Sequence, residues 1–271
     1  MNMIEINRLY NMDCLIGLRD IPDNFVDLAV TSPPYDHLRL YNGHSEFDFY
    51  GIVDELYRVM KPGGVVVWIV GDAMVKRSET CSSFRQALYF RKLGFLLHDT
   101  MIWKKTSPFQ HKVRYIQAFE YMFIFSKGVP KTTNLICDRK NSQAGKKIHG
   151  TERQQDGSLV PMSGYAKHRV IREFGARFNI WEITCDQSRE TSHPAKFPVN
   201  LAADHIVTWS NENDIILDPF MGSGSTAIAC IKTNRRYIGF EIDEVYFRES
   251  EQRVLSFCKK MEADNGQYRT V

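Results

Sequence analysis

Short apolar runs alternate along this chain with segments of helical periodicity, and this alternation restricts the fold more than any other feature. The runs are rich in β-branched and aromatic residues and are too short to be buried helices. They occupy residues 26–30, 65–70, 121–125, 215–217 and 237–240. Helical patterns cover residues 51–60, 82–93, 199–209, 225–232 and 243–260. This order predicts an α/β fold, a doubly wound and mostly parallel sheet with helices on both faces.

The segment from residue 128 to residue 190 interrupts the alternation. It has few apolar runs, several glycines and the polar stretch 154–158. We therefore predict one α/β domain formed by residues 1–127 and 191–271, with residues 128–190 inserted at the edge of its sheet. Elsewhere, Lys61-Pro62-Gly63-Gly64 is expected to end a helix and to turn the chain into the next strand.

A glycine-containing motif follows the strand predicted at residues 215–217. Asp218 ends that strand, two spaced glycines follow, and a helix begins at Ser225 or Thr226. Glycines let the backbone approach a ligand closely, and this loop lies where open α/β sheets bind ligands. No lysine follows the glycines, as a phosphate loop would require, and Asp218 would suit a positively charged group. Glu241, at the end of the next strand, can accept hydrogen bonds from both hydroxyls of a ribose.

A second motif, Thr31-Ser32-Pro33-Pro34-Tyr35, directly follows the strand predicted at residues 26–30. An amino group on a flat aromatic ring is a poor nucleophile because its lone pair is delocalised. The Ser32 hydroxyl and the Pro33 carbonyl can each accept a hydrogen bond from one of the two N–H groups of this amine. The consecutive prolines fix the backbone so that the two oxygens point in one direction. Tyr35 can stack on the ring. Taken by itself, this motif could be a simple polyproline turn. Because the same chain also contains the glycine motif, a catalytic role is favoured.

Together the two motifs resemble those of the amino-methylating DNA methyltransferases of the β arrangement, in which the catalytic motif precedes the cofactor motif. Residues 11–14, 59–64, 119–127 and 193–198 match further segments of this family. The resemblance implies a Rossmann-like methyltransferase fold of the seven-stranded type and S-adenosyl-L-methionine as cofactor. It implies transfer of a methyl group to the exocyclic amine of a base flipped out of double-stranded DNA.

The same resemblance assigns site residues. The implied catalytic residues are Ser32, Pro33, Pro34 and Tyr35. The implied cofactor-binding residues are Asp13, Cys14, Lys196, Phe197, Asp218, Phe220, Gly222, Ser223, Gly224, Thr226, Glu241 and Ile242. Asp48 is expected either to border the pocket or to cap the helix that follows it.

The acceptor base stays open between cytosine N4 and adenine N6. In this family Ser at the first motif position is typical of cytosine enzymes and Asp of adenine enzymes, so Ser32 slightly favours cytosine. Both amines present the same two hydrogens, so the chemistry of the motif does not decide. A reaction at a ring carbon is excluded, because it needs a Cys nucleophile where Tyr35 follows Pro34.

Two other functions compete with DNA methylation. The catalytic motif recognises only an amine on a planar ring, so the acceptor could instead be RNA or a small molecule. The chain could also be a catalytically silent DNA-binding subunit, although its two intact motifs argue against this.

Positive charge is concentrated in and around the insertion. The segment from Lys127 to Lys196 contains 13 Lys and Arg residues against 7 Asp and Glu residues, whereas the whole chain has a net charge of only +3. A local basic surface suits contact with phosphates, and the resemblance assigns target recognition to the insertion. For each basic residue simple solvent exposure is the alternative. The DNA-binding candidates are Lys104, Lys105, Arg139, Lys140, Lys146, Lys147, Arg153, Arg169 and Arg172.

Other features set expectations about location and partners. No stretch approaches the ~20 apolar residues of a membrane helix, and the first residues lack a secretory core, so we expect a cytoplasmic protein without membrane contact. Six scattered cysteines and isolated histidines predict neither a metal site nor disulfides. No nuclease motif is visible, so cleavage of DNA would need a separate restriction endonuclease. The resemblance also implies a homodimer.

Overall fold

The structure is a computed structural model that describes residues 4–34, 47–106, 114–148, 150–161, 169–185, 192–193 and 198–267. It divides into two compact units. The first consists of Met1–Asn134 and Asn179–Val271, and the second of Leu135–Phe178.

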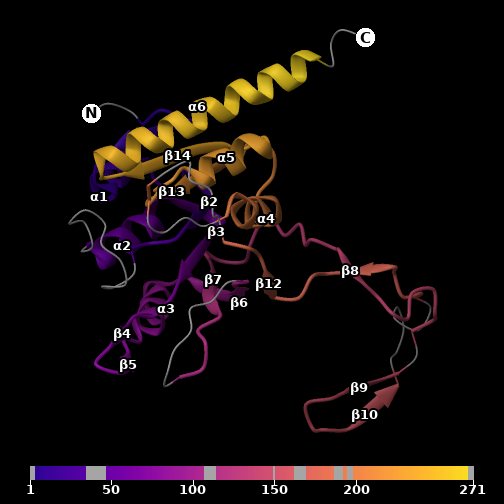
Figure 1. Cartoon of the computed structure of the whole chain (residues 1–271). Helices are drawn as coiled ribbons and strands as arrows, with labels where there is room; N and C mark the ends of the chain where they lie inside the picture. The colour runs from indigo at the N-terminus through magenta and orange to yellow at the C-terminus, as the bar shows by residue number, and fades with distance from the viewer. Residues whose placement is uncertain are drawn as a thin grey trace. The chain divides into compact units, whose positions relative to one another are not determined.

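The first unit is built from alternating strands and helices (Figure 1). Its strands are β1 (Arg8–Asn11), β2 (Val26–Thr31), β3 (Met60–Val70), β4 (Met74–Val75), β5 (Ser78–Glu79), β6 (Leu96–Lys104), β7 (Phe119–Ser126), β12 (Ile180–Glu182), β13 (Ile215–Asp218) and β14 (Arg236–Glu241). Its helices are α1 (Cys14–Arg19), α2 (Phe49–Val59), α3 (Ser82–Leu93), α4 (Val199–Trp209), α5 (Ser225–Lys232) and α6 (Glu244–Gln267). Every strand and helix expected from periodicity is present.

Eight of these strands form one sheet in the order β1-β14-β13-β2-β3-β7-β6-β12. The pairs from β1 to β3 are parallel, β7 runs antiparallel to both of its neighbours, and β12 pairs parallel with β6. The predicted mostly parallel sheet is confirmed, and β12 adds an edge strand to the seven expected.

Two apolar cores cover the two faces of the sheet. Along β3, Val65, Val67 and Ile69 belong to one core with residues of α4, α5 and α6. The alternate residues Val66 and Trp68 belong to the other core, with residues of α1, α2 and α3. Because side chains alternate between the faces of a strand, a fully apolar run such as 65–70 requires cover on both sides. The doubly wound prediction is thus confirmed.

The segment Lys61–Gly64 differs from its prediction. α2 does end at Val59, but these residues belong to β3 instead of forming a separate turn. The pairing with β2 shifts between Val26–Met60 and Leu28–Val65, which marks a bulge. The amide of Gly63 donates to the carbonyl of Lys127 at 2.6 Å, so long-range pairing holds this glycine-containing stretch in the strand.

The second unit is a narrow antiparallel ribbon. It contains β8 (Arg139–Lys140) paired with β11 (Phe174–Gly175), and β9 (Thr151–Arg153) paired with β10 (Leu159–Pro161). Between these pairs, Lys147 and Val170 form an isolated antiparallel bridge. Most described side chains of this unit are exposed, as expected for a two-stranded element without a sheet face to bury.

Within the residues that the structure describes, no helix combines the length and the apolar character needed to cross a membrane.

Candidate active site

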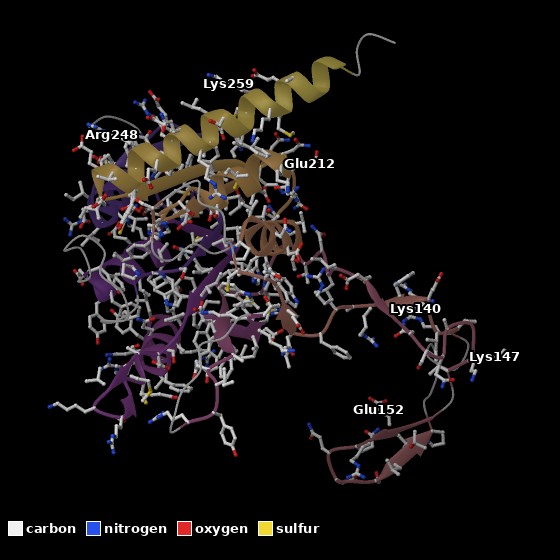
Figure 2. The ribbon with its side chains drawn as sticks, in the orientation of Figure 1. Lys140, Lys147, Glu152, Glu212, Arg248 and Lys259 are labelled. Atoms are coloured by element: carbon white, nitrogen blue, oxygen red, sulfur yellow. The ribbon has the colours of Figure 1, made fainter. Side chains whose placement is uncertain are left out.

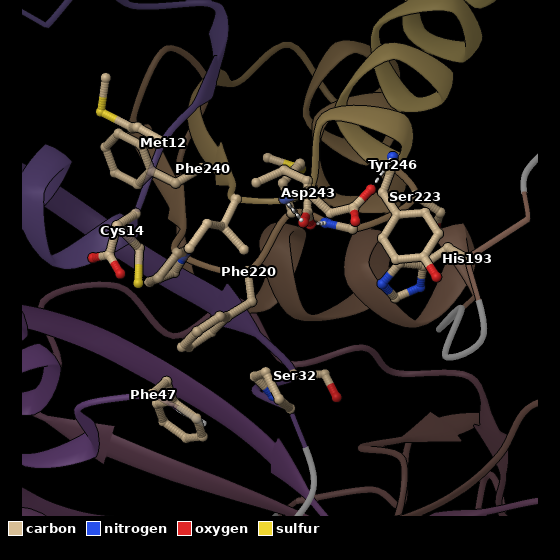
Figure 3. Close-up of a pocket in the computed structure, with 17 residues that line it drawn as sticks. Met12, Cys14, Ser32, Phe47, His193, Phe220, Ser223, Phe240, Asp243 and Tyr246 are labelled. Atoms are coloured by element: carbon tan, nitrogen blue, oxygen red, sulfur yellow. Dashed lines mark hydrogen bonds between the residues drawn. The ribbon is translucent and has the colours of Figure 1, made fainter. Parts of the chain in front are cut away.

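A pocket opens at the carboxyl ends of four neighbouring strands, β1, β2, β13 and β14 (Figure 3). Each strand contributes the residues that follow or end it. The lining consists of Met12, Asp13, Cys14, Ser32, Pro34, Phe47, His193, Pro219, Phe220, Met221, Gly222, Ser223, Phe240, Glu241, Ile242, Asp243 and Tyr246. The loops around Ser32 and Gly222 therefore meet in one cavity. The predicted reaction requires this arrangement, because one loop is expected to hold the acceptor base and the other the methyl donor.

A buried carboxylate joins these two loops behind the pocket wall. Asp218 is fully buried and accepts hydrogen bonds from the hydroxyls of Thr31 and Thr226, each at 2.6 Å. It also accepts from the amide of Phe220 at 3.0 Å. Burial raises the pKa of Asp218 to about 6, although the three hydrogen bonds oppose the rise. Asp218 thus connects the end of β2, the glycine loop and the first turn of α5.

Glu241 presents a second carboxylate, this one on the pocket wall. Its Oε2 accepts from the Gly222 amide and its Oε1 from the Asp243 amide, both at 2.9 Å. Burial raises the pKa of Glu241 to about 6, against the effect of these two amides. Each carboxylate oxygen has two lone pairs, so both oxygens can accept a further hydrogen bond from a ligand.

The rest of the lining is apolar and aromatic, with a negative balance of charge. The rings of Phe47 and Phe220 meet edge to face at 5.2 Å between centroids, and Met12 and Phe240 also border the cavity. Among the described lining residues Asp13, Glu241 and Asp243 carry carboxylates, and none is Lys or Arg. Such a pocket suits a flat nucleobase with an attached positive charge and disfavours a pyrophosphate.

Comparison with known proteins identifies the family. The family model described as DNA methylase (N6_N4_Mtase) matches residues 26–252. The chain is 54% identical to the orphan methyltransferase M.BamHII of Bacillus amyloliquefaciens over 255 residues, which cover 90% of this chain and 95% of that protein. The chain belongs to the DNA methylase family. It is a DNA methyltransferase of the N4-cytosine or N6-adenine type, and its methyl donor is S-adenosyl-L-methionine.

Further relatives agree with this assignment. The methyltransferase is 27% identical to the Type II methyltransferase M.BglII of Bacillus subtilis, over 89% of this chain and 67% of that protein. The Thermus thermophilus protein TTHA0409, solved in complex with S-adenosyl-L-methionine, matches with a TM-score of 0.63 and 27% identity over 92% of this chain and 93% of that chain. The cytosine-N4-specific PvuII DNA methyltransferase matches with a TM-score of 0.65 and 20% identity, over 94% of this chain and 92% of that chain, which shows a shared fold.

The pocket of this methyltransferase fits its donor. Glu241 offers acceptors to ribose hydroxyls, the aromatic side chains offer faces and edges to a purine, and the carboxylates offset a sulfonium charge. The predicted residues that line the pocket are Asp13, Cys14, Ser32, Pro34, Phe220, Gly222, Ser223, Glu241 and Ile242. Asp13 also caps α1, since its Oδ1 accepts from the Leu15 amide at 2.7 Å.

Four predicted site residues do not line this pocket, and three others lie outside the described residues. Asp218 and Thr226 were expected to contact the cofactor, but their side chains bond to each other behind the wall. Gly224 is buried at the start of α5, where its φ of 79° lets the loop enter the helix. Pro33 is buried. The residues not described are Tyr35, Lys196 and Phe197.

Several lining residues were not predicted. Phe47 and Tyr246 have no chemical motif around them that assigns a pocket role, and His193 was not itself named as a site residue; the rings of His193 and Tyr246 meet at 4.8 Å between centroids. The segment 193–198 was matched to the family, which is the signal that could have led to His193. Asp48, in contrast, caps α2 by accepting from the Gly51 amide at 3.0 Å and does not line the pocket, so the capping alternative is confirmed.

The candidate DNA-binding residues fall into two groups. Lys104 pairs with Glu182 at 2.8 Å and Lys105 pairs with Glu120, so both ammonium groups already have acidic partners. Arg139 packs inside the ribbon, where its guanidinium donates to the Ala176 carbonyl and lies over the Phe178 ring. Lys104 is exposed despite its ion pair, and so are the remaining candidates: Lys140, Lys146, Lys147, Arg153, Arg169 and Arg172.

Proposed function

We propose that this methyltransferase transfers the methyl group to the exocyclic amine of a base flipped out of double-stranded DNA, and that cytosine N4 is the acceptor. The observation that carries the proposal is the shared pocket of Ser32, Pro34 and the glycine loop, held together by the bond between Thr31 and Asp218. When bound, S-adenosyl-L-methionine supplies an electrophilic methyl group on a sulfonium.

Ser32 and Pro33 act on the amine. The Ser32 hydroxyl accepts a hydrogen bond from one N–H of the amine. Pro33 is buried and does not line the pocket, so only its backbone carbonyl, next to Ser32 in the chain, is assigned to the other N–H. The two hydrogen bonds localise the lone pair on nitrogen. No strong general base is needed, because the proton leaves after the methyl group has been transferred. Half-buried Ser32 lies at the pocket, so a base must leave the duplex stack to reach it.

The preference for cytosine rests on Ser32, since serine at this motif position is typical of the cytosine enzymes of the family. The relative that shares 54% identity is named an orphan methyltransferase, which supports modification of DNA without an obligatory endonuclease partner. A cytoplasmic location agrees with a chromosomal or phage DNA substrate. The homodimer implied by the family stays a prediction, which sedimentation velocity would test.

Target recognition is proposed for the second unit. Leu135–Phe178 contains nine Lys and Arg residues and four Asp and Glu residues, while the rest of the chain contains 26 and 28. Lys140 and Lys147 lie along its ribbon (Figure 2). Exposed cations on an antiparallel ribbon can bind phosphates and reach base edges in a groove.

Methylation of bacterial genomic DNA with the labelled donor, followed by nucleoside mass spectrometry, tests both the activity and the base. We expect N4-methylcytosine, and Ser32→Ala should reduce its formation by about 100-fold or more while S-adenosylhomocysteine still binds. N6-methyladenine would correct the base, methylation of RNA alone would refute the substrate, and an active Ser32→Ala enzyme would refute the role of the hydroxyl.

A further inference from the structure

A small hairpin formed by β4 and β5 carries two cations at its tip. Met74 pairs with Glu79 and Val75 with Ser78, which leaves Lys76 and Arg77 as a two-residue turn. Both residues are exposed, and their φ angles are 49° and 67°. Within the described residues neither side chain forms an ion pair.

The backbone of this turn is unsuited to its residues. Two-residue hairpins with positive φ at both positions strongly prefer Asn-Gly or Asp-Gly, because other side chains are strained there. Lys76 and Arg77 occupy both positions in spite of this cost. Strain of this kind persists mainly where a function needs it. The two long cationic side chains therefore indicate a role that a well-suited Asn-Gly turn could not fill.

The hairpin is fixed at its base. Asp72 accepts hydrogen bonds from the Ser83 amide at 3.0 Å, the Ser82 hydroxyl at 3.1 Å and the Thr80 hydroxyl at 3.3 Å. The Thr80 amide donates to the Ala73 carbonyl at 3.0 Å. These bonds join the hairpin to the start of α3, so the two cations are carried on an ordered support.

The hairpin follows the carboxyl end of β3, on the side of the sheet where the pocket opens. β2 and β3 are parallel neighbours in which Thr31 pairs with Trp68, so the chain passes from β2 into Ser32 and from β3 into Gly71 at the same side of the sheet. Figure 1 shows β4 and β5 beyond the end of β3, next to α3.

A neighbouring loop adds to the same surface. Arg114 donates to the Arg77 carbonyl and forms an ion pair with Glu79 at 3.7 Å, so its loop is joined to the hairpin. The next residue, Tyr115, is 100% exposed. An exposed aromatic side chain, next in the chain to a residue that contacts the hairpin, suits nucleic acid, because a ring can stack on a base while Lys76 and Arg77 bind phosphates.

We propose that Lys76, Arg77 and Tyr115 form a further DNA-contact surface, joined through Arg114, and that this surface holds the phosphate backbone beside the flipped base. This inference rests on DNA being the substrate. The residues outside the second unit carry a slight excess of acidic side chains, so these cations are not part of a general basic background.

The test replaces the turn by its preferred residues. The double variant Lys76→Asn/Arg77→Gly removes both charges and relieves the backbone, so its melting temperature should be unchanged or higher. Binding of a fluorescent duplex that the wild type methylates should weaken by about ten-fold. The plot of log affinity against log salt concentration should lose about 1.8 of its slope, as expected for two phosphate contacts. Binding of S-adenosylhomocysteine should not change.

A matched control variant is Arg91→Ala/Lys92→Ala, which removes two exposed charges from the far end of α3 and should leave the salt slope as it is. The inference is refuted if the hairpin variant keeps the wild-type affinity and slope, or if both double variants lose them equally. A wild-type enzyme that methylates RNA and not DNA would instead refute the proposed function, which separates the two failures.

Discussion

The hydrogen bond from Thr31 to Asp218 links two functional loops through the interior of the protein. The partners are 187 residues apart, and both side chains are fully buried. Thr226 completes the bridge from the first turn of α5. The bridge fixes the spacing between Ser32, which we propose acts on the amine, and the glycine loop, which we propose binds the methyl donor.

Replacing Thr31 by Val tests this bridge, because valine has the same shape without the hydroxyl. We expect kcat to fall by about 10- to 100-fold through misplacement of Ser32, with the cofactor Kd within about three-fold of wild type. Single-turnover kinetics and calorimetry separate the two effects. Thr31→Ser, which retains the hydroxyl that donates to Asp218, should recover most of the rate. Equal activity of the valine and serine variants would contradict a positioning role.

Asp218 illustrates what sequence could and could not predict at this scale. An acidic residue between a strand and a glycine loop predicts an important position. Whether its carboxylate faces the ligand or the interior depends on Thr31 and Thr226, and the motif alone does not show that they converge on it. Phe47 was missed for a related reason, since an apolar side chain in a loop has no pattern that distinguishes a pocket wall from a core.

At the scale of elements, the end of β14 holds a carboxylate whose titration should be measurable. The pKa of Glu241 rises from 4.5 to about 6 because of burial. The native state therefore binds this proton more readily than the unfolded chain, and the group's contribution to the free energy of unfolding falls as pH rises from about 4.5 to about 6. The change amounts to about 2 kcal/mol.

Glu241→Gln removes this titration. The free energy of unfolding of the ligand-free enzyme can be measured with urea at pH 4 and pH 7. The difference between variant and wild type should be about 2 kcal/mol more favourable to the variant at pH 7 than at pH 4. Titration of Asp218 occurs in both proteins and largely cancels in the difference. A difference that does not vary with pH would contradict the raised pKa. Wild-type affinity for S-adenosylhomocysteine should also decrease below about pH 6, as the proposed ribose acceptor becomes protonated.

The elements themselves were well predicted, because apolar runs and helical periods are local. The exception is Lys61–Gly64, where proline and two glycines indicate a turn. Here Lys61 pairs with Asp27 at 2.7 Å, and Gly63 and Gly64 exchange backbone hydrogen bonds with Lys127. These long-range partners override the local preference and extend the strand.

At the scale of the whole molecule, the proposed catalytic site and the proposed target-recognition surface belong to different units. The pocket residues all belong to the first unit, and six of the seven exposed DNA-binding candidates belong to the second, Lys104 being the exception. Replacing residues 135–178 by a short Gly-Ser linker should therefore leave S-adenosylhomocysteine affinity within about three-fold of the full chain, as measured by calorimetry. Preference for one DNA sequence should be lost. Failure of the shortened protein to bind the ligand would show that the first unit depends on the second.

Asparagines mark both junctions between the units. The backbone amide of Asn134 donates to the Thr208 carbonyl at 2.8 Å, and the backbone carbonyl of Asn179 accepts from the Ile102 amide at 2.8 Å. The residues that flank the second unit on both sides are thus hydrogen-bonded to the first unit, Asn134 to α4 and Asn179 to β6. If the second unit reads the target as proposed, recombination that exchanges the segment between these two residues would give the same catalytic unit a different DNA sequence preference in one step.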